Sequence, residues 1–462
     1  MRRLVFICLP ALCWGAFFAP TVQGAEPTAL EVRAALRKAA GFFHEQVSTR
    51  GGYLWAYSGD LKLREAEGRA TLTQAWVQPP GTPAVGEAML EAYTATRDEY
   101  HLKAARASAQ VLLNGQLPTG GWFYSVNVGA APGRQRKSTL DDDTTTAAVR
   151  FLMRLDKLTG FKDRAVHAGA KRALDAMLRV QFPNGAWYMW WDELSPDRSA
   201  RNYPVFRARY PKAWPRQWDN KWTGRYFLND NVTQNMIRTL LLAHAIYGEA
   251  RFKAAAERAG DFLILAQMPE PQPAWAQQYS PAMEPVWDRK FEPPAITGHE
   301  SQSAMDVLLL LYEKTNKKKF LEPIPRALAY LKKSRLPNGK LSRFYELRTN
   351  KPLFFYRQGK RYFLTYDDSR VPNHYSFHRE SRLDAIEAEY KRLLANKPKS
   401  PSILPKATKV YQILSAMDAR GAWVERGRLP HHKLEPSSGI IQCQLFVDNV
   451  VTLSRWLRMQ GR

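Results

Sequence analysis

The chain has 462 residues, of which 45% are hydrophobic, so it can bury a large core in one domain or in two to three smaller ones. Lysine and arginine outnumber aspartate and glutamate by 25, which favours acidic partners such as uronate polymers, sulfated glycans or envelope phosphates. A solvated basic surface without a single partner is the alternative. No nucleic-acid-binding motif is visible, so we expect no nucleic acid partner.

The N-terminal residues predict export. Two arginines, an apolar run and the small residues Gly24 and Ala25 are typical of a secretory signal peptide over residues 1–24, which favours a secreted or periplasmic protein. A retained membrane anchor is the alternative. Cys8 and Cys13 fall inside this segment, which leaves Cys443 alone and excludes an intramolecular disulfide. No later apolar run is long enough to span a bilayer, so we expect no membrane span in the mature chain.

Helical periodicity dominates the chain from about residue 29 to residue 335. The clearest apolar repeats, three and four residues apart, cover residues 29–47, 86–116 and 233–248. One kind of turn recurs between these segments, as RGGYLWAYS, LPTGGWFYS, FPNGAWYMWW and LPNGKLSRFYE. The first three copies lie about 65 residues apart, which leaves room for two helices each.

This repeat predicts an all-α fold built from helical hairpins. Hairpins of this kind close into an α/α toroid, an incomplete α/α barrel whose long irregular loops gather at one end. We expect the toroid over residues 25–395 and a C-terminal extension of unassigned role over residues 396–462. A basic, aromatic insertion without helical period covers residues 195–222 and is typical of a functional loop.

Three consecutive aspartates, Asp141 to Asp143, precede an apolar helical pattern. A single aspartate there is explained by N-capping, but one cap cannot use three carboxylates. Because carboxylates packed together repel each other, a divalent cation is the natural compensation, and hard oxygen ligands suit calcium (Ca²⁺). Asp141 and Asp142 are therefore candidate metal ligands. Asp230, between two asparagines ahead of another helix, repeats the pattern and has the same capping alternative.

Two further stretches are candidates for substrate binding. Residues 272–311 contain Trp275, Trp287, Arg289 and Glu300 outside any helical period; the alternative is a loop packed on the toroid, with Glu300 as a cap. Single aromatic residues are more often core than binding platforms.

Residues 336–361 place Arg343 beside aromatic residues, and Lys351 follows. Guanidinium groups pair with carboxylates and aromatic rings stack on sugar rings, so this composition suits a chain of acidic sugars. A solvated basic loop is equally compatible with it.

Several motifs, in order, resemble polysaccharide lyase family 10, the helical pectate lyases. They are TLDDDTT, FPNGAWY, LNDNVTQN, PAWAQQYSPAMEPVWDRKFEPPAITGHES and LSRFYELRTNKPLF, and they cover about residues 40 to 360. The resemblance implies an α/α toroid that cleaves polygalacturonate, or a related uronan, by calcium-assisted anti β-elimination to 4,5-unsaturated products.

The resemblance also implies roles for individual residues. It makes Arg343 the catalytic base and Asp141 a catalytic residue that holds calcium against the substrate carboxylate. Arg289 matches an arginine that binds substrate, and Asp230, in a second acidic motif that faces the same cleft, is also expected to bind substrate. A non-catalytic protein that binds acidic polysaccharide on the same toroid is the main alternative, and a glycoside hydrolase with paired carboxylates is a third.

Overall fold

The computed structural model describes residues 26–129, 135–193, 198–400, 405–432 and 439–460. The expected signal peptide, with Cys8 and Cys13, lies outside these ranges, as do residues 195–197 of the expected insertion. In the described ranges no helix is both long and apolar enough to cross a membrane.

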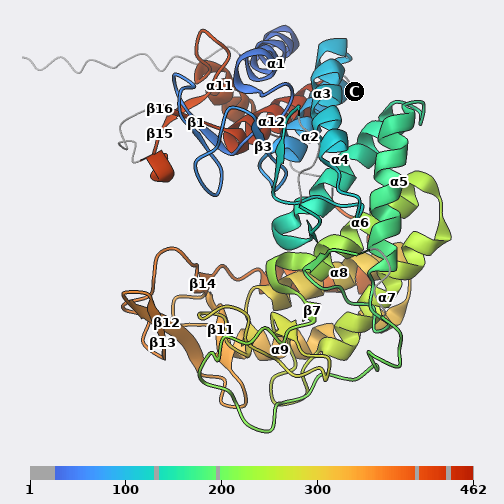
Figure 1. The fold of residues 1–462 in the computed structure, drawn as a ribbon, viewed down its shortest axis with the longest axis vertical. Helices are drawn as coiled ribbons and strands as arrows, with labels where there is room; N and C mark the ends of the chain where they lie inside the picture. Colours follow the sequence, from blue (N-terminus) through green and yellow to red (C-terminus); the bar gives the residue numbers. More distant parts are fainter. Residues whose placement is uncertain (1–25, 130–134, 194–197, 401–404, 433–438, 461–462) are drawn as a thin grey trace, which may run out of the picture.

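Five helices contact one another in the order α12, α2, α4, α6, α8 and form a curved inner row (Figure 1). These helices are α2 (Thr82–Thr96), α4 (Thr144–Leu158), α6 (Val232–Tyr247), α8 (Glu300–Thr315) and α12 (Cys443–Gln460). Most of the predicted helical hairpins are present, because α2 packs on α3, α4 on α5 and α6 on α7. The fold is therefore the predicted α/α toroid.

An outer set of helices covers this row. Its members are α1 (Ala29–Phe42), α3 (Glu99–Gly115), α5 (Arg164–Arg179), α7 (Ala250–Ala266), α9 (Ile324–Lys333) and α11 (Ala407–Ser415). Helix α10 (Leu383–Leu394) packs on α8 and α9 and so extends the inner row beyond α8. The predicted helix over residues 29–47 ends in a π-helical turn, η1 (Phe43–Val47). The pattern over residues 86–116 is divided between α2 and α3, since Arg97 ends α2 with φ 59° and Asp98 caps α3 by accepting from the Tyr100 amide.

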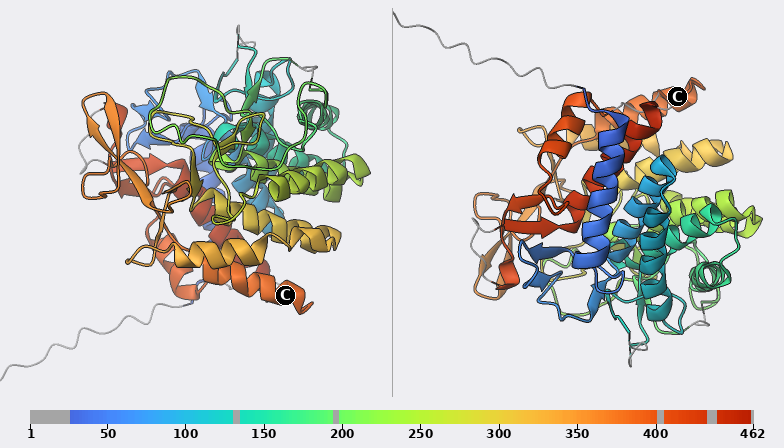
Figure 2. Two further views of the ribbon diagram at one scale, coloured as in Figure 1. Left: turned by 90° about the horizontal axis from the view of Figure 1, so that it is seen from below. Right: turned by 90° about the horizontal axis from the view of Figure 1, so that it is seen from above.

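The C-terminal region, which had no assigned role, contributes to the helical row. Helix α12 packs on α1 and α2, so the two ends of the described chain lie side by side (Figure 2). Strands from both ends also share one antiparallel sheet. Its order is β15 (Val424–Arg426), β16 (Gly439–Gln442), β1 (Ala56–Ser58) and β2 (Arg64–Glu65).

The repeated turns owe their conformation to glycine and tryptophan. Gly120 and Gly185 have φ of 91° and 95°, and at Gly185 a Cβ would lie 2.0 Å from the Arg258 carbonyl oxygen, so only glycine fits. A fully buried tryptophan follows in two turns and donates its indole N–H to a carbonyl of the preceding helix: Trp122 to Leu112 at 2.7 Å and Trp187 to Met177 at 2.8 Å. Each of these turns is thus the same packing unit, a glycine turn followed by a tryptophan buried against the preceding helix.

Short antiparallel ladders join the segments that connect an outer helix to the next inner helix. They are β3 (Gln74–Trp76) with β4 (Ser125–Asn127), β5 (Ser138–Thr139) with β6 (Trp190–Trp191), β7 (Tyr226–Phe227) with β8 (Gln278–Tyr279), and β10 (Leu341–Ser342) with β14 (His378–Arg379). Because these ladders lie ahead of the inner helices, they gather the long loops at one end of the toroid.

A second four-stranded sheet stands beside the helices. Its order is β13 (Arg361–Thr365), β12 (Pro352–Gln358), β11 (Phe344–Glu346) and β9 (Ala295–Thr297). A small apolar cluster that includes Trp287 and Phe355 packs around this sheet, separate from the large core of the toroid. The sheet occupies the region where the helical pattern of the sequence fades.

Candidate active site

An acidic cluster lies where two inner helices begin. Asp141, Asp142 and Asp230 each offer a carboxylate oxygen, and these three oxygens lie within 4.8 Å of one another. They come from two short 3-10 turns, η2 (Asp141–Asp143) ahead of α4 and η3 (Asn229–Asn231) ahead of α6. The two turns contact each other. Asp142 and Asp230 are 88 residues apart in the sequence. The structure therefore brings the two acidic motifs together.

The two turns have the same backbone. Asp142 and Asp230 have φ of 45° and 48°, and the residues that follow them, Asp143 and Asn231, have φ of 64° and 59°. Aspartate and asparagine tolerate this left-handed region better than other residues with a side chain. Asp142 and Asp230 thus occupy equivalent positions in successive hairpins.

Neither turn uses its middle residue as a helix cap. No side-chain capping hydrogen bond is present at the start of η2, α4, η3 or α6. Asp143 instead forms an ion pair with Arg150, whose Nη1 lies 2.9 Å from Asp143 Oδ1, and accepts from Thr146 at 2.5 Å. One of the three aspartates is therefore committed to structure, and the other two remain for the cluster.

Proximity of like charges shifts the titration of the acidic cluster. Loss of solvation, then repulsion by Asp141 and Glu67, raises the pKa of Asp142 to about 6. Burial, followed by repulsion from Asp142 and Asp141, raises the pKa of Asp230 well above its ordinary value. The charged cluster is thus unfavourable without a positive partner.

The donor set fits a hard cation such as calcium. Asp141 Oδ1 and Asn231 Oδ1 are buried and have no hydrogen-bond partner within the described part of the chain, so both are free to coordinate. Two other oxygens are oriented by neighbours: Tyr124 donates to Asp141 Oδ2, and Gln78 donates to Asp142 Oδ2 at 2.8 Å. An all-oxygen set of this kind favours calcium over softer metals.

The acidic cluster borders a cleft of about 570 Å³. The residues that line it come from the loops ahead of several inner helices: Trp55, Gln78, Pro79, Pro80, Asp142, Asp143, Asp230, Asn231, Asn235, His299, Arg343 and Arg379. One side of the cleft is therefore acidic, and another carries guanidinium groups. An anionic ligand and a cation can both be held there.

Arg343 is the predicted site residue that faces the acidic cluster across this cleft. It lies between β10 and β11, and its backbone is fixed on both sides: its N–H donates to Phe377 O at 2.7 Å, and its carbonyl accepts from Gly298 at 3.1 Å. Its side chain is only 6% exposed and stands over the Tyr375 ring, 4.2 Å from the centroid.

Glu300 governs the charge of Arg343. Fully buried at the start of α8, it lies 3.5 Å from Arg343 Nη2. Burial by itself lowers the pKa of Arg343, but Glu300 and the neighbouring Tyr375, Glu292 and Asp230 outweigh it and raise the pKa above its ordinary value. The guanidinium is therefore charged in the substrate-free protein. Glu300, predicted to bind substrate, instead contacts Arg343.

Arg289 stands next to the cleft and acts on the acidic cluster through its charge. Its guanidinium forms a fork with the buried Glu292, at 2.5 and 2.6 Å, while 47% of its side chain is exposed. Its charge lowers the pKa values of Asp142 and Asp230, opposing the effects of burial and repulsion. Arg289 is not among the residues that line the cleft. It does, however, face the Tyr375 ring from 5.9 Å.

Three predicted substrate-binding residues lie elsewhere. Trp275 is fully buried and donates to Leu263 O at 2.7 Å, as the tryptophans of the repeated turns do, so it cannot contact a substrate. Trp287 is 6% exposed, donates to Pro215 O at 2.5 Å and borders a different groove. Lys351 is exposed, and its Nζ stands over the Tyr366 ring, 5.1 Å from the centroid. The packing alternative describes the two tryptophans, and the alternative of a solvated basic loop describes Lys351.

Several cleft residues were not singled out in the sequence, among them His299, Arg379, Trp55 and Gln78. His299 and Arg379 contact each other, with Arg379 Nη2 2.9 Å from His299 Nδ1, and burial is the main cause that lowers the pKa of His299. Trp55 and Gln78 also line the cleft. A signal existed for two of them, since Gln78 and His299 precede α2 and α8 just as the acidic triplets precede α4 and α6.

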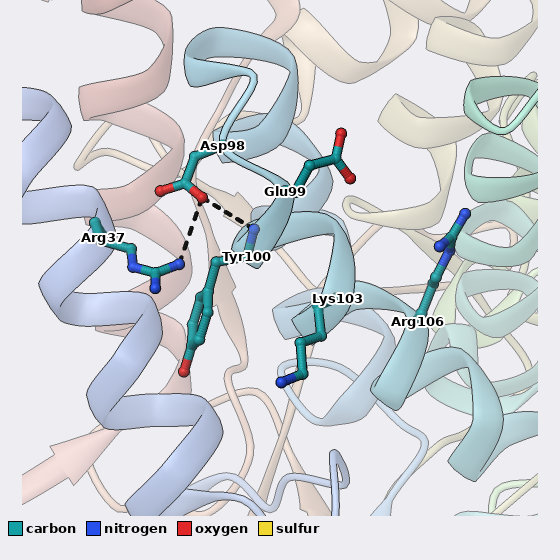
Figure 3. A pocket seen from close by; sticks show the side chains of 6 residues that line it. All are labelled: Arg37, Asp98, Glu99, Tyr100, Lys103 and Arg106. Atoms are coloured by element: carbon teal, nitrogen blue, oxygen red, sulfur yellow. Dashed lines mark hydrogen bonds and ion pairs between the residues drawn. The ribbon is translucent and has the colours of Figure 1, made fainter.

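A second hollow, of about 530 Å³, lies on the outer surface along α1 and α3 (Figure 3). It holds one ion pair, in which Arg37 Nη1 lies 3.4 Å from Asp98 Oδ1, and the Arg37 guanidinium stacks 3.5 Å above the Tyr100 ring. None of the predicted site residues lines it. It is therefore a useful reference surface for the cleft.

No protein-family model and no curated protein matches the chain. Among solved structures it is similar to a sugar epimerase from a ruminal bacterium, with 12% identity, 94% of this chain and 99% of that chain covered, and a TM-score of 0.51. A cellobiose 2-epimerase from Spirochaeta thermophila has 15% identity, 96% and 100% coverage and a TM-score of 0.49. A variant of family 10 polysaccharide lyase from Cellvibrio cellulosa, in complex with trigalacturonic acid, has 18% identity, 68% and 99% coverage and a TM-score of 0.47. At these identities the likeness concerns the fold alone, and membership of lyase family 10 stays a prediction.

Proposed function

We propose that this protein is an exported polysaccharide lyase that cleaves polygalacturonate or a related uronan by calcium-assisted β-elimination. One observation carries the proposal: Asp142, Asp230 and Arg343, which come from three different hairpins, border a single cleft. The motif resemblance described above supports the same reaction. The expected signal peptide agrees with a polymer that is met outside the cytoplasm.

The chemistry requires positive charge beside the substrate. In β-elimination a base takes the proton from C5 of a uronate, the C4–O4 bond breaks, and a double bond forms between C4 and C5. The oxygen leaves with the neighbouring sugar and takes up a proton. The C5 proton is barely acidic while the adjacent carboxylate keeps its full charge, so stabilising the developing enolate is the central task of the site.

The residues of the cleft suit this task. Asp141, Asp142 and Asp230 would hold calcium, which supplies positive charge for the substrate carboxylate when bound. Arg343, charged and desolvated, can pair with the same carboxylate through its guanidinium fork. Arg289 adds a second positive charge beside the acidic cluster.

Arg343 has a demanding role if it is also the base. The carboxylate of Glu300 favours the protonated guanidinium, so Arg343 can accept the C5 proton only after losing one of its own. Arg379 donates to His299 Nδ1, which places the hydrogen of the neutral imidazole on Nε2 and leaves no free lone pair on that ring. Among these cleft side chains Arg343 therefore keeps the role that the resemblance gives it.

The proposal is tested with the purified protein, polygalacturonate and calcium. We expect the ultraviolet absorbance of the unsaturated uronate to rise, to stop when a chelator is added and to return with excess calcium. A flat trace across several uronans would refute a lyase. New reducing ends without that absorbance would indicate a hydrolase, and polymer binding without any cleavage would indicate a binding protein.

A further inference from the structure

A second concave surface, which we call the basic groove, lies beside the candidate cleft. It has a volume of about 860 Å³ and is formed by three segments: residues 216–218, Trp287 with Lys290, and the β12–β13 hairpin at residues 355–364. Figure 1 places β12 and β13 at the edge of the molecule, away from α5 and α7. The two stretches that stand out in the sequence as basic and aromatic therefore meet in one place.

The charge of the basic groove is almost purely positive. Arg216, Lys290, Lys360 and Arg361 line it, and no aspartate or glutamate does. Arg216 pairs with Glu346. The other three form no ion pair with a carboxylate in the described ranges of the chain. Three unneutralised cations on one concave surface favour an anionic ligand with several charges.

Aromatic rings line the same surface. Trp218 is 37% exposed and is held in place by its indole N–H, which donates to Asp288 O at 3.1 Å. Tyr356 and Phe363 are stacked, with centroids 5.1 Å apart and planes inclined by 16°, and both are half-buried. The Arg370 guanidinium also stands over the Tyr356 ring, 5.0 Å from its centroid. Partly exposed aromatic rings beside cations suit a sugar ring that carries a carboxylate.

The basic groove is linked to the cleft through packed side chains, although the two share no lining residue. Lys290 of the groove follows Arg289, whose charge acts on the acidic cluster. Phe291 connects the two surfaces. Its ring centroid lies 5.1 Å from that of Tyr362 in the groove and 4.9 Å from that of Tyr375. Tyr375 is the ring over which the Arg343 guanidinium stands. The cleft and the basic groove are therefore neighbouring surfaces.

We propose that the basic groove binds a length of acidic polysaccharide beyond the sugars held in the cleft. The identity of the polymer rests on the proposed function, but the existence of the groove as a polyanion site does not. Carboxylates pair with Lys290, Lys360 and Arg361, and sugar rings lie on Trp218 and the Tyr356–Phe363 pair. The groove thus raises affinity for long chains over short ones.

The test compares two double variants that lose the same number of charges. The groove variant carries Lys360→Gln and Arg361→Gln, and the control carries Lys103→Gln and Arg106→Gln on α3, at the hollow of Figure 3. All four side chains are exposed, so neither variant disturbs the core. Affinity for polygalacturonate is measured with a chelator present, which removes any contribution from calcium or cleavage, and thermal melting checks folding.

We expect the groove variant to bind polygalacturonate about tenfold more weakly and the control to stay within about twofold of the unaltered protein. If both variants bind equally weakly, net charge alone explains the loss of affinity. If the groove variant binds as well as the unaltered protein, the groove does not bind the polymer. Either result overturns the proposal. Displacement of the polymer by single-stranded DNA at equal charge would assign the groove to nucleic acid instead. Because binding is read without turnover, an inactive protein would refute the lyase but not the groove.

Discussion

The acidic cluster and the tryptophans of the repeated turns lie in the same connecting segments but obey opposite rules. Trp122 and Trp187 are fully buried, with their indole N–H groups satisfied by backbone carbonyls. Asp142 and Asp230 have left-handed backbones and crowd like charges together. Local rules are broken where a protein needs a reactive or binding group, and they are kept where it needs only stability.

Trp275 shows why the comparison matters. It comes from the longest motif of the resemblance, yet it belongs with the tryptophans of the turns. Substitutions should therefore fall into two groups. Changes in the acidic cluster should affect calcium binding and activity while leaving stability unchanged or improved, and changes at the tryptophans should do the reverse.

The largest effect is expected from Asp142→Asn and Asp230→Asn. Each keeps the shape of the side chain but removes one ligand charge, so we expect activity to fall about 100-fold or more and calcium affinity to fall at least about tenfold. Because each change also relieves repulsion among the carboxylates, the Tm without calcium should stay level or rise. Isothermal titration with calcium, the absorbance assay and thermal melting measure the three quantities. Unchanged calcium affinity, or a clear fall in Tm, would place these residues with the structural group.

Arg343→Lys should have the next largest effect. Lysine keeps the charge but not the planar fork over Tyr375, so we expect kcat to fall about 100-fold with little change in KM. Arg289→Lys is the matched change outside the cleft lining and should leave kcat and KM within about threefold, because Arg289 acts by charge and lysine keeps that charge. Steady-state kinetics on polygalacturonate separate the two. Undiminished turnover in Arg343→Lys would move the base to another residue.

Trp275→Phe should affect stability alone. The change removes the hydrogen bond to Leu263 O and leaves a cavity, so the free energy of unfolding should fall by about 2 kcal/mol. Trp187→Phe, which loses the equivalent bond to Met177 O, should show a similar loss. Denaturant unfolding measures both. If Trp275→Phe instead raised KM and left the free energy of unfolding unchanged, Trp275 would have to be assigned to substrate binding.

Much of this division could be predicted from the sequence. The spacing of the turns predicted the toroid, because a turn that recurs with two helices between copies must serve packing. Three adjacent aspartates predicted a cation site, since capping needs only one. The same repeat also indicates the role of Trp275. A tryptophan that recurs after successive turns is explained more simply by packing than by substrate contact.

Other features depend on contacts that no local pattern reveals. Arg379 and His299 are 80 residues apart, and Glu300 meets Arg343 only because β9 and β11 pair. The sheet with β12 and β13 lies where the helical pattern fades, so its groove with residues 216–218 was invisible. Helix α12 joins the inner row by packing on α2. The two helices lie near opposite ends of the chain, so no local pattern predicts this contact.

The smallest expected effect is the sharpest test, because it separates neighbouring residues of one turn. Asp143 lines the cleft beside Asp142, but its oxygens are occupied by Arg150 and Thr146. Asp143→Asn leaves the largely buried Arg150 without its partner, so the free energy of unfolding should fall by about 1 kcal/mol. Calcium affinity and kcat should stay within about twofold, in contrast to Asp142→Asn. A loss of calcium affinity equal to that of Asp142→Asn would mean that Asp143 leaves Arg150 to join the cluster, and the division between structural and functional aspartates would then no longer hold within this turn.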